Sequence, residues 1–508
     1  MIAKTYSAIP LGYDGRIIEV EGSTNKGLPA FNIVGMANKT ISEARERVRS
    51  AIQNSDLSFP AKKITINLAP ADLSKDGSYL DLPIALTVLA ASQQLQKGDL
   101  SNKLFVGELS LDGKVRPLRG IINIIETAKA NNFKEVYIPY QNLSQASLIK
   151  DINLIGVKNL QELFLHLKNE KILKPIVRND VKNTKTDTEG PFLDDVQSQK
   201  LAKRALEIAI AGHHNILISG PPGAGKTLLA KVAANLLPPL TPEEQISITK
   251  IHSIANISDD IVTKRPFRSP HHTSSTISII GGGPKASPGE ISIANHGILF
   301  LDEIPEFPRS ILESLRQPME DKKISISRSN AKITYPADFM LIATMNPCPC
   351  GYLGDPTHKC NCTMNQILNY NKKLSGPLFD RIDINISVPK VDTSSLLLKN
   401  TTNSTEHTVV KNKITGAIKR QQSRYQRNGF YNSLLTTKQI KSIIEITPKG
   451  KQFLSTASEK LNLSARSYFK VIKVAQTIAD LDNQDIIDIP QLAEALNFRK
   501  REGSSIDF

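Results

Sequence analysis

The sequence has no tryptophan, few aromatic residues and only 4 cysteines. It also has no apolar run long enough to cross a bilayer, since stretches such as residues 84–91 are much shorter than a membrane span. The first twenty residues mix polar and apolar side chains and show no apolar segment typical of a secretion signal. We therefore expect a cytoplasmic protein with no membrane partner.

The charge is strongly unbalanced, with a formal net charge of +15. An excess of this sign favours a polyanionic partner, nucleic acid above all. A basic but merely solvated surface explains the charge equally well. Charge alone therefore leaves DNA as one of two interpretations.

Hydrophobic residues make up 40 % of the chain and charged residues 22 %, which is typical of globular proteins. Residues 171–191 are polar with few apolar anchors and predict a linker. In residues 1–170, strand-like alternation at 63–68 mixes with helical patterns and predicts a small α/β domain. Short continuous apolar runs in residues 192–390 predict a parallel-sheet core. Residues 391–508 predict a C-terminal helical lid. The fold class is α/β.

One segment carries a specific phosphate-binding motif between an apolar strand and a helical run. It matches G-x-x-x-x-G-K-[ST] and consists of Gly220, Pro221, Pro222, Gly223, Ala224, Gly225, Lys226 and Thr227. The glycines allow backbone N–H groups to surround phosphate oxygens at the start of the helix. Lys226 is expected to reach the β- and γ-phosphates, and the Thr227 hydroxyl to bind Mg²⁺. ATP and Mg²⁺ are the predicted cofactors.

Further polar residues follow apolar strands or begin helices. Asp302 and Glu303 end one strand, where Asp302 is expected near Mg²⁺ and Glu303 near the attacking water. Asn346 ends another strand and suits a sensor of the γ-phosphate. Arg381 suits an arginine finger, and Arg466 a second sensor, although either arginine also fits an ordinary surface position.

Long strings of residues carry a close family resemblance. They read R-P-F-R-S-P-H-H at 265–272, G-G-G at 281–283, P-G-E-I-S at 288–292, L-D-E-I-P-E-F at 301–307 and M-N-P-C-P-C-G at 345–351. With the motifs above, they resemble the YifB/ComM family of magnesium-chelatase-like AAA+ ATPases. The resemblance spans nearly the whole chain and its motifs are very specific.

The resemblance implies a hexameric ATPase that acts on single-stranded or branched DNA. The family includes a branch-migration helicase of natural transformation, and Arg381 would act in the neighbouring subunit's site. Insertions at about residues 267–283 and 323–336 would line a central pore, where cationic side chains hold phosphates. A purely structural hairpin is the equal alternative. The segment 195–199 departs from the family's usual Gly-Gln, which weakens the prediction of an adenine pocket.

Two other functions share the same core. One is a metal-insertion ATPase like the magnesium chelatase subunit, against which the N-terminal domain and the cysteine-containing insert argue. The other is a protein-remodelling chaperone or protease partner, which the basic charge disfavours. Each would show ATP hydrolysis that does not respond to DNA.

Residues 1–170 resemble the Lon-protease domain, but without its catalytic pair. The position of the nucleophilic serine falls on Tyr79 or Asp81 and not on Ser78, and that of the activating lysine falls near Ile122. A serine needs a base within hydrogen-bond reach to act as a nucleophile. We therefore predict a non-proteolytic domain used for DNA contact or ring assembly.

All the cysteines lie in the insert 348–362, in two C-x-C pairs, Cys348 with Cys350 and Cys360 with Cys362. Four thiolates at this spacing predict a tetrahedral, structural Zn²⁺ site. His358 could replace one thiolate. Disulfides are the alternative, and a reducing cytosol disfavours them.

Overall fold

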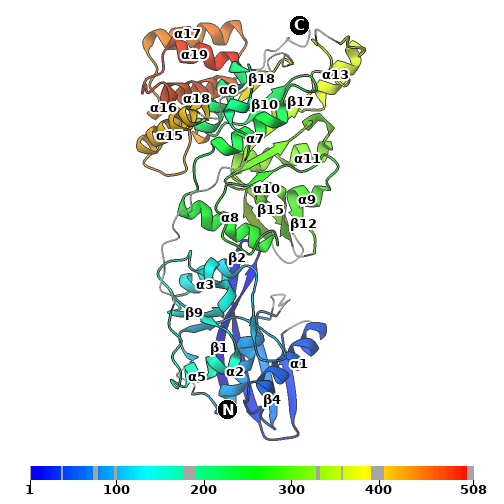
Figure 1. Ribbon diagram of the computed structural model, residues 1–508, viewed down its shortest axis with the longest axis vertical. Helices are drawn as coiled ribbons and strands as arrows, with labels where there is room; N and C mark the ends of the chain where they lie inside the picture. The colour runs from blue at the N-terminus through cyan, green and yellow to red at the C-terminus, as the bar shows by residue number, and fades with distance from the viewer. Residues whose placement is uncertain are drawn as a thin grey trace.

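The computed structural model describes residues 2–35, 38–71, 78–96, 100–175, 190–284, 286–327, 332–355, 358–390 and 405–499. Its parts follow one another along a long axis, from the N-terminal domain through a parallel-sheet domain to a helical end (Figure 1). Parts of several predicted segments lie outside the described residues: residues 72–77 of the N-terminal domain, linker residues 176–189, hairpin tip 328–331, and lid residues 391–404 and 500–508. Among the described helices, none is long and apolar enough to span a membrane.

The N-terminal domain contains a seven-stranded sheet in the order β3-β4-β2-β1-β5-β8-β9. The strands are β1 (Ile2–Leu11), β2 (Asp14–Asn25), β3 (Ala30–Val34), β4 (Lys63–Ala69), β5 (Lys103–Phe105), β8 (Glu135–Pro139) and β9 (Asn153–Val157). The predicted strand at 63–68 is β4, whose alternate residues Ile64, Ile66 and Leu68 are fully buried. This alternation presents one face of the strand to a core.

Helices cover both faces of this sheet. One face packs against α1 (Asn38–Asn54), α2 (Asp81–Ala91) and α5 (Leu160–Leu167), and the other against α3 (Ile121–Ala130) and α4 (Leu143–Ala146). A turn at Asp112-Gly113 joins the two strands of a small hairpin, β6 (Glu108–Leu109) and β7 (Val115–Arg116). Gly113 has a φ of +81°, a conformation that favours glycine.

The central domain is built on a five-stranded sheet in the order β11-β14-β17-β10-β18, and all neighbouring strands are parallel. The strands are β10 (Ile216–Ser219), β11 (Phe267–Arg268), β14 (Ile298–Leu301), β17 (Met340–Met345) and β18 (Ile384–Ser387). Alternate residues join cores on opposite faces, as Ile216 and Leu217 do. The apolar runs in the sequence follow from burial on both faces.

Helices and two short hairpins complete this domain. The helices are α6 (Lys200–Gly212), α7 (Lys226–Leu236), α8 (Pro242–Ile254), α9 (Thr276–Ile280), α10 (Glu290–Ile293), α11 (Arg309–Ser314), α12 (Arg316–Asp321), α13 (Met364–Lys372) and α14 (Gly376–Phe379). The hairpins are β12 (Gly281–Gly282) with β13 (Ser287–Pro288), and β15 (Lys323–Ser327) with β16 (Lys332–Pro336). They pack together, since the Tyr335 hydroxyl donates to the Ala286 carbonyl at 2.8 Å.

The helical end consists of α15 (Thr405–Tyr425), α16 (Thr437–Ile443), α17 (Pro448–Lys460), α18 (Ala465–Leu481) and α19 (Ile489–Asn497). Its apolar side chains share one core with α6, α7 and a face of the central sheet. Buried polar contacts add to this packing: His214 Nε2 lies 2.8 Å from the Thr477 hydroxyl of α18. The helices of the predicted lid are therefore packed directly on the parallel-sheet domain.

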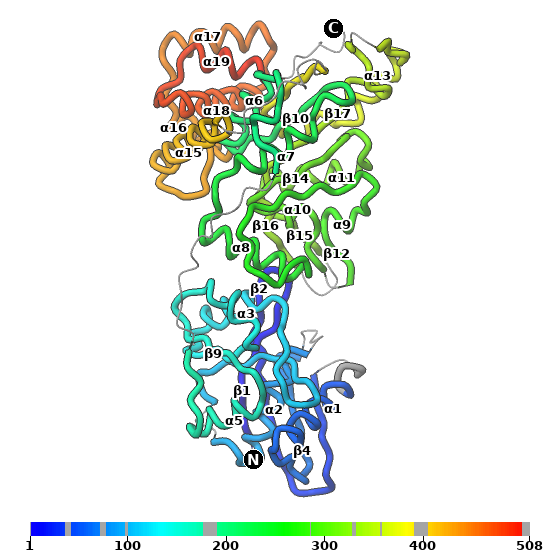
Figure 2. Tube along the Cα trace, viewed as in Figure 1, coloured from blue at the N-terminus to red at the C-terminus, as the bar shows by residue number. Residues whose placement is uncertain are grey.

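The N-terminal domain contacts the central domain through the tip of the β1–β2 hairpin, which reaches α8 (Figure 2). The Tyr13 hydroxyl lies 3.0 Å from Ser247 Oγ, and Lys250 Nζ lies 3.9 Å from the centre of the Tyr13 ring. Lys250 also pairs with Glu126 at 2.5 Å. At Gly12 the backbone approaches Ile333 of β16 so closely that no side chain would fit. This tip therefore touches both α8 and the β15–β16 hairpin.

Candidate functional site

The phosphate-binding motif forms a loop between β10 and α7. Gly223 and Gly225 have φ of +77° and +75°, and Gly225 directly precedes the helix. Gly220 is needed for another reason, because a methyl group there would collide with the Val388 carbonyl oxygen. The loop therefore directs the free N–H groups at the start of α7 toward one point, which is the geometry that binds phosphate.

Lys226 lies across this loop, and the residue is 9 % exposed. Its Nζ donates to Asn346 Oδ1 at 2.9 Å and to the carbonyls of Gly220 and Pro221 at 2.5 and 3.2 Å. Burial lowers the pKa of the Lys226 ammonium, and the carboxylates of Asp302 and Glu303 oppose that shift. Lys226 and Asn346 are thus in direct contact at the carboxyl ends of β10 and β17.

The acidic pair lies on the other side of Lys226. The Thr227 hydroxyl donates to Asp302 Oδ2 at 3.2 Å, and the Thr344 hydroxyl donates to Asp302 Oδ1. The Glu303 N–H donates to Thr344 Oγ1 at 3.0 Å, while the Glu303 side chain is exposed. Hydroxyl and carboxylate oxygens are the ligands that Mg²⁺ prefers, so Thr227 and Asp302 fit this cation. Glu303 is free to orient a water molecule.

Thr344 and Gln199 take part in this site without having been assigned a role from the sequence. Thr344 holds both members of the acidic pair, and Gln199 Nε2 donates to the Ala224 carbonyl of the loop at 2.8 Å. A buried hydroxyl two residues before Asn346 was the only available signal for Thr344. Gln199 lies in the segment that departs from the family pattern, and that segment does contact the loop.

The two candidate arginines lie elsewhere. Asn215, which immediately precedes β10, donates to the Arg381 carbonyl at 3.0 Å, so Arg381 lies at the amino edge of the sheet. The phosphate loop is at the other end of the same four-residue strand, about 13 Å away at the usual rise per residue. Arg381 Nη2 pairs with Glu320 of α12 at 2.8 Å, and Arg466 pairs with the same carboxylate. The structure therefore brings these arginines together, away from their own loop.

The exposure of the two arginines differs. The Arg381 side chain is 10 % exposed, and its Nη1 donates to the Pro377 carbonyl at 2.5 Å. The Arg466 side chain is 44 % exposed. The two positive charges lower the pKa of the Glu320 carboxyl, against the opposing effect of its burial. Both arginines are therefore engaged with Glu320 and not with the phosphate loop of their own chain.

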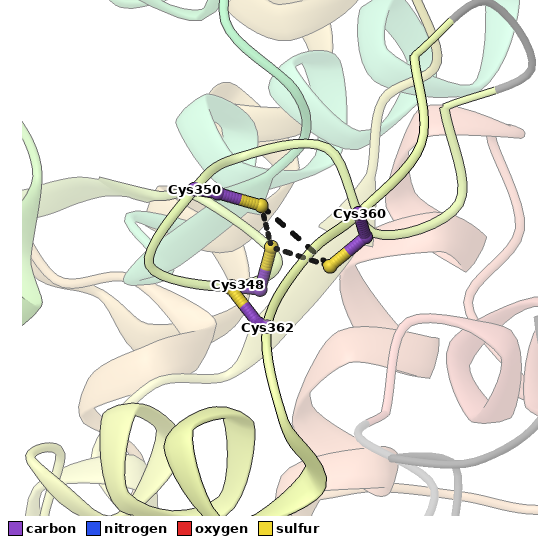
Figure 3. Close-up of side chains that lie close together, drawn as sticks. All are labelled: Cys348, Cys350, Cys360 and Cys362. Carbon is purple, nitrogen blue, oxygen red and sulfur yellow. Dashed lines mark hydrogen bonds between the residues drawn. The ribbon is translucent and has the colours of Figure 1, made fainter.

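The cysteines of the insert converge at one point, drawn in Figure 3. Cys348 Sγ lies 3.3 Å from Cys350 Sγ and 3.7 Å from Cys360 Sγ, and all four sulfur atoms lie within 4.8 Å of one another. A tetrahedral zinc with Zn–S bonds of about 2.3 Å requires sulfur atoms roughly 3.8 Å apart. The observed distances fit this requirement and are too long for disulfides, and all four cysteines are free.

His358, the alternative ligand, lies outside this group. Its ring stacks on Tyr352 with centroids 4.9 Å apart, and its Nδ1 is 3.6 Å from Asp355. Among the described residues, the group of potential metal ligands consists of the four cysteines alone. Four sulfur ligands leave no open position for chemistry, so the arrangement suits a structural metal.

The N-terminal domain shows what occupies the positions of the protease pair. The Ser78 hydroxyl donates to Glu108, and Ile122 is completely buried. Asp81 is buried and accepts two hydrogen bonds from Arg47, at 2.7 and 3.2 Å. Burial raises the pKa of Asp81 to about 6, against the opposing charge of Arg47. A buried ion pair thus stands at Asp81, one of the two positions predicted for the nucleophile, and an apolar side chain at Ile122, the position predicted for its base.

The phosphate loop, the acidic pair after β14 and the asparagine after β17 meet at one edge of a parallel sheet that carries a helical lid. This fold and site define a magnesium-chelatase-type AAA+ ATPase. Three family models agree: "Magnesium chelatase, subunit ChlI" matches residues 192–396, "Subunit ChlI of Mg-chelatase" residues 20–142, and "Magnesium chelatase, subunit ChlI C-terminal" residues 404–499.

Individual relatives show which family within this class of ATPases the chain is similar to. Competence protein ComM of Haemophilus influenzae is 42 % identical over 505 residues, covering 98 % of this chain and 97 % of its own. Uncharacterized protein YifB of Escherichia coli is 40 % identical over 493 residues, covering 96 % and 95 %. Lon protease 2 of Bacillus subtilis is 30 % identical over 167 residues, covering 29 % and 30 %. The chain belongs to the YifB/ComM family of magnesium-chelatase-like AAA+ ATPases.

Proposed function

We propose that this protein is an ATP-driven DNA motor of the cytoplasm, a hexameric helicase that promotes branch migration in recombination during natural transformation. The observation that supports a ring of subunits is that the catalytic groups are divided between two edges of one sheet. Lys226 and the acidic pair lie at one edge, whereas Arg381 and Arg466 lie at the other. A complete site then requires two neighbouring subunits.

In this mechanism each side chain has a separate task. The loop amides and Lys226 hold the phosphates, and Thr227 with Asp302 holds Mg²⁺, which neutralises charge on the phosphates. Glu303 orients the attacking water, and Asn346 contacts the γ-phosphate beside it. Arg381 of the neighbouring subunit stabilises the charge of the transition state.

The proposal of DNA as substrate is supported by the net charge of +15 and by the similarity to a competence protein. The packed hairpins β12–β13 and β15–β16 suit the pore lining, with exposed Lys323 and Lys332 on the second hairpin. Such lysines would hold phosphates without distinguishing bases. The Lon-like N-terminal domain would be non-proteolytic and would contribute to DNA contact or assembly. Peptide cleavage lost in Ser78→Ala would contradict that role.

ATP hydrolysis by the full chain, with and without single-stranded and branched DNA, tests the proposal. We expect DNA to stimulate ATP hydrolysis. We expect this stimulation to vanish in both Lys226→Ala and Arg381→Ala. Arg316→Ala is the matched control, because Arg316 is a partly exposed arginine that pairs locally with Glu313. Hydrolysis that requires Lys226 but ignores DNA would instead favour the metal-insertion or protein-remodelling function. Hydrolysis unaffected by Arg381→Ala would contradict the shared site.

A further inference from the structure

The cysteine loop touches the phosphate loop directly. Cys348 follows Asn346 by two residues, and at Gly351 the backbone turns with a φ of +84°. A methyl group on Gly351 would lie 2.8 Å from Pro222 Cδ and 2.9 Å from Pro222 Cγ, too close for a real contact. The cysteine loop is therefore in close contact, at Gly351, with Pro222 of the phosphate-binding motif.

Contacts from three other segments support the phosphate loop, in addition to the hydrogen bond that the Gly220 N–H donates to the Met345 carbonyl at 3.2 Å. At its first residue, Gly220 packs closely on the Val388 carbonyl, just after β18. At Ala224, the carbonyl accepts from Gln199, just before α6. At Pro222, between these two points, the support is Gly351. The first two supports adjoin regular elements that are packed in the core, whereas the third belongs to the cysteine loop.

The positions of the cysteine sulfur atoms indicate what holds the Gly351 turn in place. Gly351 directly follows Cys350 and donates its N–H to the Cys348 carbonyl at 3.0 Å. Cys360 Sγ lies 3.6 Å from Cys350 Sγ, so both C-x-C pairs meet beside this turn (Figure 3). A metal bound by all four thiolates would fix the turn, since metal binding supplies folding free energy to the segment that carries the ligands.

We propose that the cysteine site binds one borderline-soft divalent cation, Zn²⁺, and that the bound metal stabilises the phosphate loop through Gly351 and Pro222, so that metal and nucleotide strengthen each other's binding. The inference rests on the proposed nucleotide site. Couplings between two sites typically correspond to about 5- to 150-fold in affinity. Because the contact is direct but is one of several supports, we expect an effect of about tenfold.

Linkage gives the proposal a second readout that does not depend on hydrolysis. If metal raises nucleotide affinity, nucleotide must raise metal affinity by the same factor. The equilibrium affinity of the site for Zn²⁺, measured against a competing chelator, should therefore be about tenfold higher when a non-hydrolysable ATP analogue is bound.

The test uses the full-length protein with Zn²⁺ bound, and the metal-free protein obtained from it by chelation. Metal content is measured by elemental analysis, and affinity by titration with a fluorescent ATP analogue. We expect one zinc per chain, nucleotide binding weakened about tenfold after removal, and full recovery when Zn²⁺ is added back. Recovery excludes irreversible unfolding as the cause.

Two variants separate metal binding from the contact. Cys360→Ser with Cys362→Ser should lose the metal and bind nucleotide as weakly as the metal-free protein. Gly351→Ala keeps all four thiols but forces Pro222 away, so it should retain zinc and still bind nucleotide weakly. In Gly351→Ala, removal of zinc should no longer change nucleotide affinity, because the contact that transmits the effect is already lost.

The outcomes distinguish this inference from the proposed function. No nucleotide binding by the zinc-loaded wild-type protein would contradict the nucleotide site itself. Normal binding with equal affinity in the presence and absence of metal would overturn the coupling alone. A protein that contains no metal, or whose zinc affinity is the same with and without nucleotide, would also overturn it.

Discussion

Thr344 illustrates how much of the site depends on single side chains. Its hydroxyl donates to Asp302 and accepts from the Glu303 N–H, so one residue of β17 holds both members of the acidic pair after β14. Glu303 has a φ of +51°, a left-handed conformation that is uncommon for this residue type. The contact to Thr344 helps to keep that conformation, and so aims the carboxylate that would orient water.

His213 provides a prediction at this scale. It ends α6 with a φ of +55°, and its ring stacks on Tyr431 of the lid with centroids 5.0 Å apart. Burial lowers the pKa of His213 to about 3, whereas an unfolded histidine titrates near pH 6.5. A lowered pKa contributes stability that is present above pH 6.5 and is lost as the pH falls. Between pH 7.5 and 5 this loss is about 2 kcal/mol.

His213→Asn isolates that contribution, because asparagine tolerates the left-handed conformation and does not titrate. At pH 7.5 the variant should be less stable than the wild type, since it lacks the stacked ring. The difference in unfolding free energy between the wild type and the variant should be about 2 kcal/mol smaller at pH 5 than at pH 7.5. Urea unfolding at both pH values measures it, and a difference that does not vary with pH would contradict the assignment.

At the scale of elements, two helices and the segment after α14 meet at one carboxylate. Glu320 lies on α12, Arg381 follows α14, and Arg466 lies in the first turn of α18. These segments belong to the sheet domain and the lid, so the shared ion pairs join the two. Two guanidinium groups this close would repel each other without the carboxylate between them.

Glu320→Gln removes the charge and keeps the shape. We expect it to lower the unfolding free energy by about 1 kcal/mol, a small value because Glu320 and Arg466 are both partly exposed. Glu313→Gln is the control, since it breaks one partly exposed ion pair with Arg316, only three residues further along the chain. Thermal unfolding of both variants measures the effect. Equal melting temperatures would show that the lid does not depend on this carboxylate.

At the scale of the whole molecule, the N-terminal domain is joined to the central domain by partly buried contacts in addition to the chain connection. Tyr13 places its ring under Lys250 and its hydroxyl against Ser247, and Gln145 Nε2 donates to the Asp259 carbonyl at 2.6 Å. Because Gly12 packs on Ile333, the same tip supports the hairpin proposed to contact DNA. Movement of the β15–β16 hairpin would therefore also displace the β1–β2 tip of the N-terminal domain.

Tyr13→Ala should weaken this connection. Loss of the half-buried ring and its cation–π contact is expected to cost about 2–3 kcal/mol, and calorimetry should resolve a separate transition for the N-terminal domain. Tyr140→Ala is a matched control, because Tyr140 lies in the same domain with Lys158 Nζ 4.6 Å from its ring but is 52 % exposed. An unchanged single transition in Tyr13→Ala would contradict the docking.

The sequence by itself determined the features that depend on local patterns. The strand and helix on either side of the phosphate loop, the alternation of β4 and the turn at Gly113 all follow from the identity of neighbouring residues. The long motifs also determined the family, now supported by relatives that match over nearly the full length. Local sequence suffices here because backbone conformation and the buried face of a strand are set within a few residues.

Only the tertiary structure decided which distant residues meet. Sequence patterns assigned Arg381 and Arg466 separate tasks, and gave no indication that both lie on Glu320. Sequence patterns predicted a metal site formed by four cysteines, but they did not predict the contact between Gly351 and Pro222. Such contacts join segments that lie far apart in the chain, and their geometry depends on how the sheet orders its strands. A local pattern specifies the face that a side chain occupies, whereas packing of the complete chain specifies the residue it meets.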